Sequence, residues 1–244
     1  MTEWKYEPFD CLQRPISESL TVFPREKDIS FSAIRFFWNG VMRLWLKLYF
    51  RLKISGKQHL PKVGNFVLIS NHSSHLDAIC LLASLPFRSI STTFALAAKD
   101  YFFSTFFRSF FASIAFNALP FEREKNPRRS LELCADVLGA SHSALVMFPE
   151  GTRSLDGQMQ PFKSGLGFLV AGTDRLVVPA HISGAHQAWA KGSFFPKPKK
   201  IRVQIGPPLL FKDVPRTKEG YAHIAKTTQQ AVELCSLSNF SFTP

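Results

Sequence analysis

Cysteine is scarce in this sequence, and its spacing matches no common disulfide framework. The four copies form no CxxC pair and no arrangement typical of paired thiols. They are Cys11, Cys80, Cys134 and Cys235. Three of them lie in apolar patterns typical of helices, which favours small buried side chains and suits a reducing compartment.

A signal peptide and a long hydrophobic run are also missing. The first residues, Met1–Trp4, are polar and acidic and lack the basic region and apolar core of a secretory signal. Within the aromatic stretch 31–53, the longest segment without a charged residue is Phe36–Met42, far short of the roughly 20 apolar residues that span a bilayer. We therefore expect neither a cleaved leader nor a membrane span in these segments.

Acidic side chains are few outside the first 30 residues. The chain has 244 residues, 30 Lys or Arg and 18 Asp or Glu, which gives a net charge of +12. Residues 1–30 hold four of the basic and six of the acidic residues, so residues 31–244 carry a net charge of +14. Such a balance indicates an anionic partner: nucleic acid, an acidic lipid surface or a phosphorylated substrate. The length and the 45% hydrophobic content predict one large domain with a sizeable core.

A basic amphipathic helix is predicted for residues 31–53. A polar residue recurs at every fourth position, and the rest of the surface is apolar, with two tryptophans and four phenylalanines. The polar positions are Arg35, Asn39, Arg43, Lys47 and Arg51. The composition favours a helix that lies in a membrane interface. The alternative is a helix packed on the core with its basic stripe in solvent.

The first candidate site follows an apolar, strand-like run, Phe66–Ile69. Polar residues then place His72 and Asp77 five positions apart, with Asp77 in the first turn of a predicted helix, where a carboxylate is favourable. A carboxylate on one ring nitrogen fixes the tautomer and leaves the other nitrogen free to take a proton. The pair therefore predicts a general base, and the alternative is a surface histidine beside an ordinary helix-start residue.

Two further strand ends deliver polar side chains. Arg123 follows a short strand-like run, and Glu150–Arg153 follow the apolar run 144–148. Because open α/β sheets bind ligands where their strands end, we expect these residues to meet near His72. Gly151 permits close backbone approach, and Arg153 completes a candidate cradle for a phosphate or carboxylate. A strand-ending turn with a solvated arginine is the alternative.

Other kinds of site fit the sequence less well. Ser73 and Ser74 lie beside His72 and would suit a covalent hydrolase, but the chain has no G-x-S-x-G elbow. A zinc site with His75 lacks both a HExxH motif and a cysteine pair. No recognition motif for nucleic acid accompanies the basic charge. The basic and aromatic segment 191–202 stays open between a solvated hairpin loop and a loop that faces lipid or nucleic acid.

Together, these motifs resemble the PlsC-like glycerolipid acyltransferases, a family that includes the lysophosphatidic acid acyltransferases. Four motifs occur in that family's order: NHSSHLD (71–77) with its His-x4-Asp, FER (121–123), FPEGTRS (148–154) and VVPAHISG (177–184). FKSG (162–165) and AAKD (97–100) lie where relatives carry lysine-containing segments, which points to Lys163 and Lys99. The resemblance covers roughly residues 30–210, and four ordered motifs are specific where one would not be.

The resemblance implies a single-domain α/β fold with a mixed, largely parallel sheet flanked by helices. It divides the chain into a polar N-terminal extension (1–30), an amphipathic interfacial helix (31–55) and an acyltransferase domain (56–244) whose motifs lie within about 65–210. We expect a monotopic or peripheral protein at the cytoplasmic face of a membrane, since basic residues tend to stay on that side. Its partners would be the lipid surface and its substrates, with no nucleic acid.

The implied reaction moves an acyl group from acyl-CoA or acyl-carrier protein to the free hydroxyl of a lysophospholipid, above all 1-acylglycerol 3-phosphate. His72 would be the base and Asp77 its orienting partner. The acceptor phosphate would be bound by Arg123, Gly151, Thr152 and Arg153, with help from Lys99 or Lys163. Glu150 would orient Arg123 or bond an acceptor hydroxyl, because an anion is a poor phosphate ligand. No metal or cofactor is implied. The alternatives are another acceptor, such as glycerol 3-phosphate or a lyso-ornithine lipid, and a catalytically silent lipid-binding relative.

Overall fold

The computed structural model describes residues 29–62, 65–98, 117–122, 127–139 and 143–237. One sheet runs through this part of the chain, in the strand order β1-β7-β6-β2-β5-β3-β4. Its strands are β1 (Lys53–Ser55), β2 (Phe66–Ser70), β3 (Thr93–Ala98), β4 (Ala118–Phe121), β5 (Ala144–Met147), β6 (Leu176–Ser183) and β7 (Arg202–Ile205). The helices are α2 (Ile29–Tyr49), η2 (Lys57–His59), α3 (Asp77–Ser84), η3 (Phe87–Thr92), α6 (Pro127–Val137), α7 (Gly165–Val170), α8 (Ala185–Trp189) and α9 (Lys218–Leu237).

Strand direction confirms the predicted mixed and largely parallel sheet. Parallel pairing links β6, β2, β5, β3 and β4 in that order, whereas β7 runs antiparallel to β6 and carries β1 parallel to itself. The central strand β2 is buried along its whole length, as expected for a strand covered on both faces. From β2 the chain crosses to β3 on one side, and from β5 it later crosses to β6 on the other. The ends of β2 and β5 therefore border the position where ligands bind in open α/β sheets.

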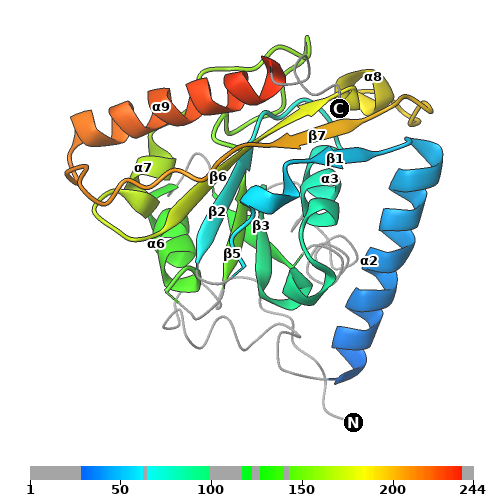
Figure 1. The fold of residues 1–244 in the computed structure, drawn as a ribbon, viewed down its shortest axis with the longest axis horizontal. Helices are drawn as coiled ribbons and strands as arrows, with labels where there is room; N and C mark the ends of the chain where they lie inside the picture. Colours follow the sequence, from blue (N-terminus) through cyan, green and yellow to red (C-terminus); the bar gives the residue numbers. More distant parts are fainter. Residues whose placement is uncertain (1–28, 63–64, 99–116, 123–126, 140–142, 238–244) are drawn as a thin grey trace.

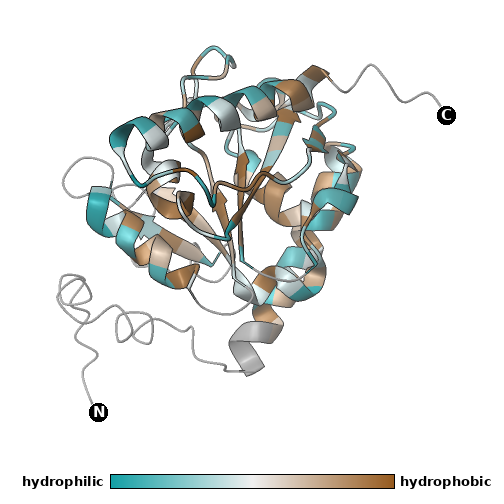
Figure 2. Cartoon of the chain, turned by 60° about the vertical axis from the view of Figure 1, so that its left-hand side comes forward, coloured by the Kyte–Doolittle hydropathy of each residue, from teal (hydrophilic) through white to brown (hydrophobic). Residues whose placement is uncertain are grey.

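Helices cover both faces of the sheet (Figure 1). Side chains from α2, α3 and α8 form one core with the sheet, and side chains from α6, α7 and α9 form the second. The central strands are among the most hydrophobic segments of the cartoon, because each face of the sheet contributes side chains to one of these cores (Figure 2). This single layered domain agrees with the predicted fold class.

Helix α2 confirms the predicted helix but ends earlier than predicted. It stops at Tyr49, and residues 53–55, which the sequence assigned to the helical segment, form β1 at the edge of the sheet. The polar stripe faces the protein: Arg35 and Asn39 are only 8% and 6% exposed. Arg43 donates to the carbonyl oxygens of Leu82 and Leu85, at 3.1 and 2.7 Å. The alternative of a solvated basic stripe is therefore wrong for these three residues.

The outward side of α2 is apolar. Its exposed large side chains recur every three or four residues: Ile34, Phe37, Val41, Leu44, Leu48 and Tyr49. We call this set the α2 outer stripe. Within the described residues, no helix combines the length and the hydropathy required to cross a bilayer.

Candidate active site

His72 and Asp77 meet as the sequence predicted. The Nδ1 atom of His72 lies 2.9 Å from Oδ2 of Asp77, which is fully buried at the start of α3. The same oxygen accepts the backbone N–H groups of Ser73 and Ser74, each at 2.7 Å. Because this oxygen accepts both backbone N–H groups, we take it as the acceptor of the His72 bond too, with the proton on Nδ1. The Nε2 atom of His72 is then the free acceptor.

The backbone of His72 is fixed from the neighbouring strand end. Its N–H donates to Oε1 of Glu150 at 2.7 Å, and its carbonyl accepts the N–H of Ser154 at 2.9 Å. Its ring stacks on Phe148, with the ring centroids 4.0 Å apart. Since β2 and β5 pair side by side, residues just beyond their ends can brace one another in this way. The imidazole is thus held through both its backbone and its ring.

Glu150 is buried beside His72 and braces its backbone. The side chain is only 2% exposed, and its second oxygen accepts the N–H of Gln160 at 3.1 Å. Burial raises the pKa of this carboxyl to about 7, although the two backbone donors work in the opposite direction. Each oxygen accepts one backbone N–H, so Glu150 ties His72 to Gln160. Its predicted contact with Arg123 or an acceptor hydroxyl stays a prediction.

An elongated cavity of about 670 Å³ opens beside His72. Gly151 and Lys163 line it near the imidazole, and its remaining wall is largely apolar. The apolar lining includes Leu96, Phe121, Leu131, Met147, Phe168 and Tyr221. Gly151 has a φ of 76°, and a Cβ at this position would lie 2.9 Å from the Lys163 ammonium nitrogen. Glycine therefore allows both this backbone conformation and the close approach of the lysine.

Two other predicted binding residues, Thr152 and Arg153, do not line this cavity. Arg153 approaches the ring of His75, 2.8 Å from its Nε2 atom, and does not line the cavity. Burial and then the Arg153 charge lower the pKa of His75, which keeps the ring neutral and able to accept. Thr152 is exposed and also outside the lining. Lys99 and Arg123 lie outside the described residues, so their predicted contacts stay predictions.

Some residues of the site were not singled out from the sequence. Phe148 supports the His72 ring, and Arg128 and Tyr221 line the cavity. Phe148 begins the FPEGTRS motif, which pointed to the site, whereas Arg128 lies in the first turn of α6, outside the motifs. Tyr221 lies in α9, beyond every motif, and no pattern in the sequence could have indicated it. In the part of the chain that is described, no group of three or more His, Cys, Asp or Glu side chains could hold a metal ion.

Comparison with known proteins agrees with this geometry. A family model described as acyltransferase matches residues 51–183. The 1-acyl-sn-glycerol-3-phosphate acyltransferase of Limnanthes douglasii is 30% identical over 158 residues, 65% of this chain and 54% of that protein. The alpha form from Mus musculus is 26% identical over 181 residues, 71% of this chain and 61% of that protein. The chain thus spans somewhat more than half the length of these two relatives.

The fold has a counterpart among solved structures. The crystal structure of the 1-acyl-sn-glycerophosphate acyltransferase PlsC from Thermotoga maritima has a TM-score of 0.66 at 19% identity, over 94% of this chain and 89% of that one. This likeness supports the layered α/β arrangement around the β2 and β5 strand ends. With a family match over more than half of its residues, the chain belongs to the acyltransferase family.

Proposed function

We propose that this protein transfers an acyl group from an acyl thioester to the free hydroxyl of a lysophospholipid, with 1-acylglycerol 3-phosphate as the acceptor and phosphatidic acid as the product. The observation that carries the proposal is the His72–Asp77 pair, with His72 lining a cavity that Lys163 also lines. The names of the relatives support the same reaction and acceptor.

The reaction follows from the tautomer of His72. With Nδ1–H donated to Asp77, Nε2 takes the proton of the acceptor hydroxyl as its oxygen attacks the thioester carbonyl carbon. A C–O bond forms, the tetrahedral intermediate collapses, and the C–S bond breaks. The thiolate then takes the proton from the imidazolium, which returns His72 to its starting state. The buried carboxylate of Asp77 stabilises the imidazolium while it exists.

The cavity assigns roles to the two substrates. Lys163 supplies a cation for the acceptor phosphate, beside the open backbone at Gly151, and Arg128 adds a second positive charge on the lining. The apolar wall accommodates hydrocarbon, which makes it the binding place for an acyl chain. Either CoA or acyl-carrier protein can deliver the thioester, because both are acidic and the body of the protein is basic. The reaction uses no metal and no bound cofactor.

The α2 outer stripe is suited to contact with a lipid surface. An apolar helix face that is turned away from the protein is costly in water and favourable at the boundary between headgroups and acyl chains. We assign the protein to a monotopic position at the cytoplasmic face of the membrane, with α2 lying in the interface. The acceptor, with one acyl chain, and the product, with two, then both stay at the membrane during the reaction.

The test is transfer of a labelled acyl group to lysophosphatidic acid, from acyl-CoA and from acyl-carrier protein, by the purified full chain. We compare the wild type with His72→Ala and with His223→Ala, which removes an exposed histidine of α9. Loss of the base lowers the transfer rate by about 10²–10⁴-fold, and the control retains it. Equal rates for the wild type and His72→Ala would refute the mechanism. If no lysophospholipid is acylated with either donor, the chain is a lipid-binding relative without this activity.

A further inference from the structure

A pair of phenylalanines protrudes from the loop between α8 and β7. Phe194 and Phe195 are 89% and 76% exposed, the highest values among the large hydrophobic side chains of the described residues. Their ring centroids lie 5.7 Å apart, so they form one apolar tip. Exposing two adjacent aromatic rings to water is unfavourable in free energy. Such an exposed apolar surface indicates contact with an apolar partner, such as a protein or a membrane. Neither ring takes part in the candidate active site.

Hydrogen bonds hold this loop against the end of α2. The indole N–H of Trp189 donates to the carbonyl of Ser193 at 3.0 Å, which closes the base of the tip. The Tyr49 hydroxyl donates to the carbonyl of Pro196 at 3.0 Å, and the Arg51 guanidinium donates to that of Pro198 at 3.1 Å. Tyr49 belongs to the α2 outer stripe. The apolar tip is therefore tied to the last turn of α2, beside the stripe.

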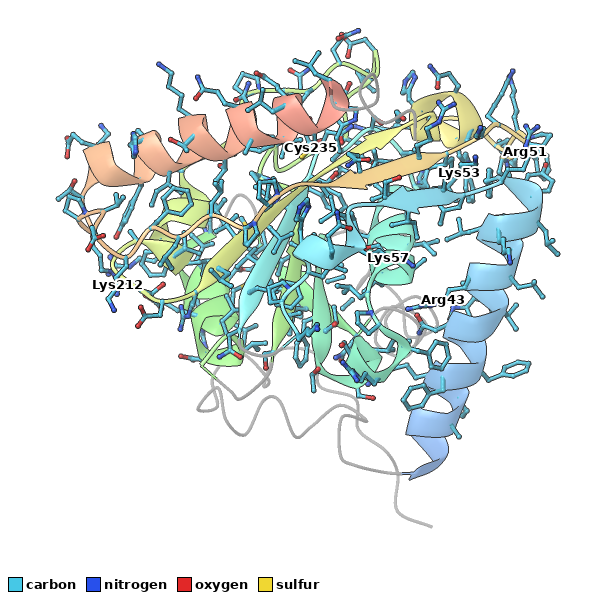
Figure 3. All side chains as sticks on the ribbon, in the orientation of Figure 1. Arg43, Arg51, Lys53, Lys57, Lys212 and Cys235 are labelled. Carbon is cyan, nitrogen blue, oxygen red and sulfur yellow. The ribbon has the colours of Figure 1, made fainter. Side chains whose placement is uncertain are left out.

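Positive charge gathers around the same loop. The stretches 29–76 and 175–212 contain no acidic residue. The sheet brings them together, because β1 pairs with β7 and places Lys53 directly opposite Arg202. The charges of Lys53, Arg202 and Arg51 lower the pKa of Lys200, which is a sign of crowding among cations. Figure 3 shows Arg51 and Lys53 together at the end of the molecule where α2 meets β1, far from Lys212.

These cations lack acidic partners. Among the described residues, neither Lys53 nor Lys200 nor Arg202 forms an ion pair with a carboxylate. Like charges directly opposite on paired strands are destabilising, and an external anion offsets that cost. Lys191, Lys197 and Lys199 extend the same charge along the loop. Carboxylates of the described residues therefore leave the positive charge of this cluster unneutralised.

We propose that the loop 191–200, with Lys53, Arg51 and Arg202, is a second membrane-binding element that recognises anionic lipid. Phe194 and Phe195 enter the interface, and the surrounding cations bind the phosphate-bearing headgroups of acidic lipids. An aromatic tip surrounded by basic side chains matches the arrangement of apolar and charged groups at an anionic bilayer surface. An acidic protein surface would pair with the cations but would not provide an apolar interior into which the two rings could insert. The inference rests on the membrane position of α2 proposed above.

Vesicle flotation with the full chain tests this element. Phosphatidylcholine vesicles are compared with vesicles that also contain phosphatidylglycerol, without any substrate. Lys199→Gln/Lys200→Gln lowers binding to the anionic vesicles on the order of tenfold, because two cations that attract acidic headgroups are lost, and leaves binding to phosphatidylcholine unchanged. Phe194→Ser/Phe195→Ser weakens binding to both vesicles on the order of tenfold, because the apolar contact does not depend on charge.

Matched changes on α9 serve as controls. Lys218→Gln/Lys226→Gln and Leu234→Ser/Leu237→Ser alter exposed residues of the same kinds on the opposite side of the sheet, and both variants bind like the wild type. Unchanged binding of the two loop variants to anionic vesicles would overturn the proposal. So would a lysine variant that binds vesicles normally and loses only transfer from acyl-carrier protein, since the surface would then serve that protein.

A wild type that prefers anionic vesicles but transfers no acyl group would refute the reaction and retain this inference.

Discussion

Helices α2 and α9 are nearly equal in length, with 21 and 20 residues, and they cover opposite faces of one sheet. Helix α9 buries Ile224, Thr228 and Val232 against the sheet and exposes mostly polar side chains, as a surface helix in water does. Helix α2 has the reverse arrangement along much of its length. Arg35 and Asn39 are buried against the protein, whereas Phe37, Leu44 and Leu48 face outward.

The contrast shows that the surroundings, rather than the amphipathic pattern alone, decide which face of a helix turns inward. Burial lowers the pKa of Arg43, which records the cost of removing a cation from water. Two carbonyl oxygens at the end of α3 offset that cost by accepting its N–H groups. The apolar face can then point away from the protein, where lipid would replace water in the membrane position proposed above. Helix α9 has no such arrangement and needs none.

We expect the largest difference between the two helices in how strongly their exposed apolar side chains contribute to vesicle binding. Phe37→Ser/Leu48→Ser removes two exposed apolar side chains from the α2 outer stripe, and Leu234→Ser/Leu237→Ser removes two from α9. We expect the α2 change to weaken binding to phosphatidylcholine vesicles by about a hundredfold, since each side chain contributes at least 1.4 kcal/mol when it enters lipid. The α9 change leaves binding unaltered. Flotation measures both, and equal losses would break the comparison.

For the free energy of unfolding, we expect the larger effect in α9 and the smaller one in α2. Ile224→Ala empties a fully buried position beneath α9 and costs about 2–5 kcal/mol of unfolding free energy, from lost burial and the remaining cavity. Leu44→Ala shortens an exposed side chain of α2 and changes the same quantity by about 0.5 kcal/mol or less. Urea unfolding in a mild detergent gives both values. A larger cost at Leu44 would mean that its side chain packs on the protein.

The smallest effect concerns the polar side of α2. Arg43→Met leaves the carbonyls of Leu82 and Leu85 without their donor and costs about 1–3 kcal/mol of unfolding free energy. Lys47→Met, an exposed cation on the same helix, is the control and stays near the wild type. The same unfolding curves report both. If the two variants lost equal stability, the net positive charge of α2, and not the Arg43 hydrogen bonds, would stabilise its packing on the protein.

Local features of the site could be predicted from the sequence. His72 and Asp77 are five residues apart and span the start of one helix, so their contact depends on a single turn. The order of strands and helices around them follows from short apolar runs with polar ends. The two strand ends that carry His72 and Gly151 meet because parallel neighbours end at the same edge of the sheet.

The remaining details depend on packing between distant segments. Nothing near Glu150 in the sequence shows that its carboxylate turns inward to a backbone N–H, 78 residues away along the chain, rather than outward to a ligand. Arg153 approaches His75 for an equally non-local reason. A three-residue strand such as β1 is too short for an alternating pattern, and its pairing with β7 becomes visible only in three dimensions. Periodicity located the α2 stripes but could not say which one faces the protein.

The brace on His72 also sets an order of events during synthesis. Both groups that fix its backbone, Glu150 and Ser154, are translated after it, and the hydrogen bond to Glu150 spans 78 residues. At the usual 5–20 residues per second, about 4–16 s separate the appearance of the histidine from that of its brace. Helix α2 is complete before His72 is made. On the membrane position proposed above, a growing chain would settle on the membrane while His72 is still unpositioned, so attachment would precede completion of the candidate site.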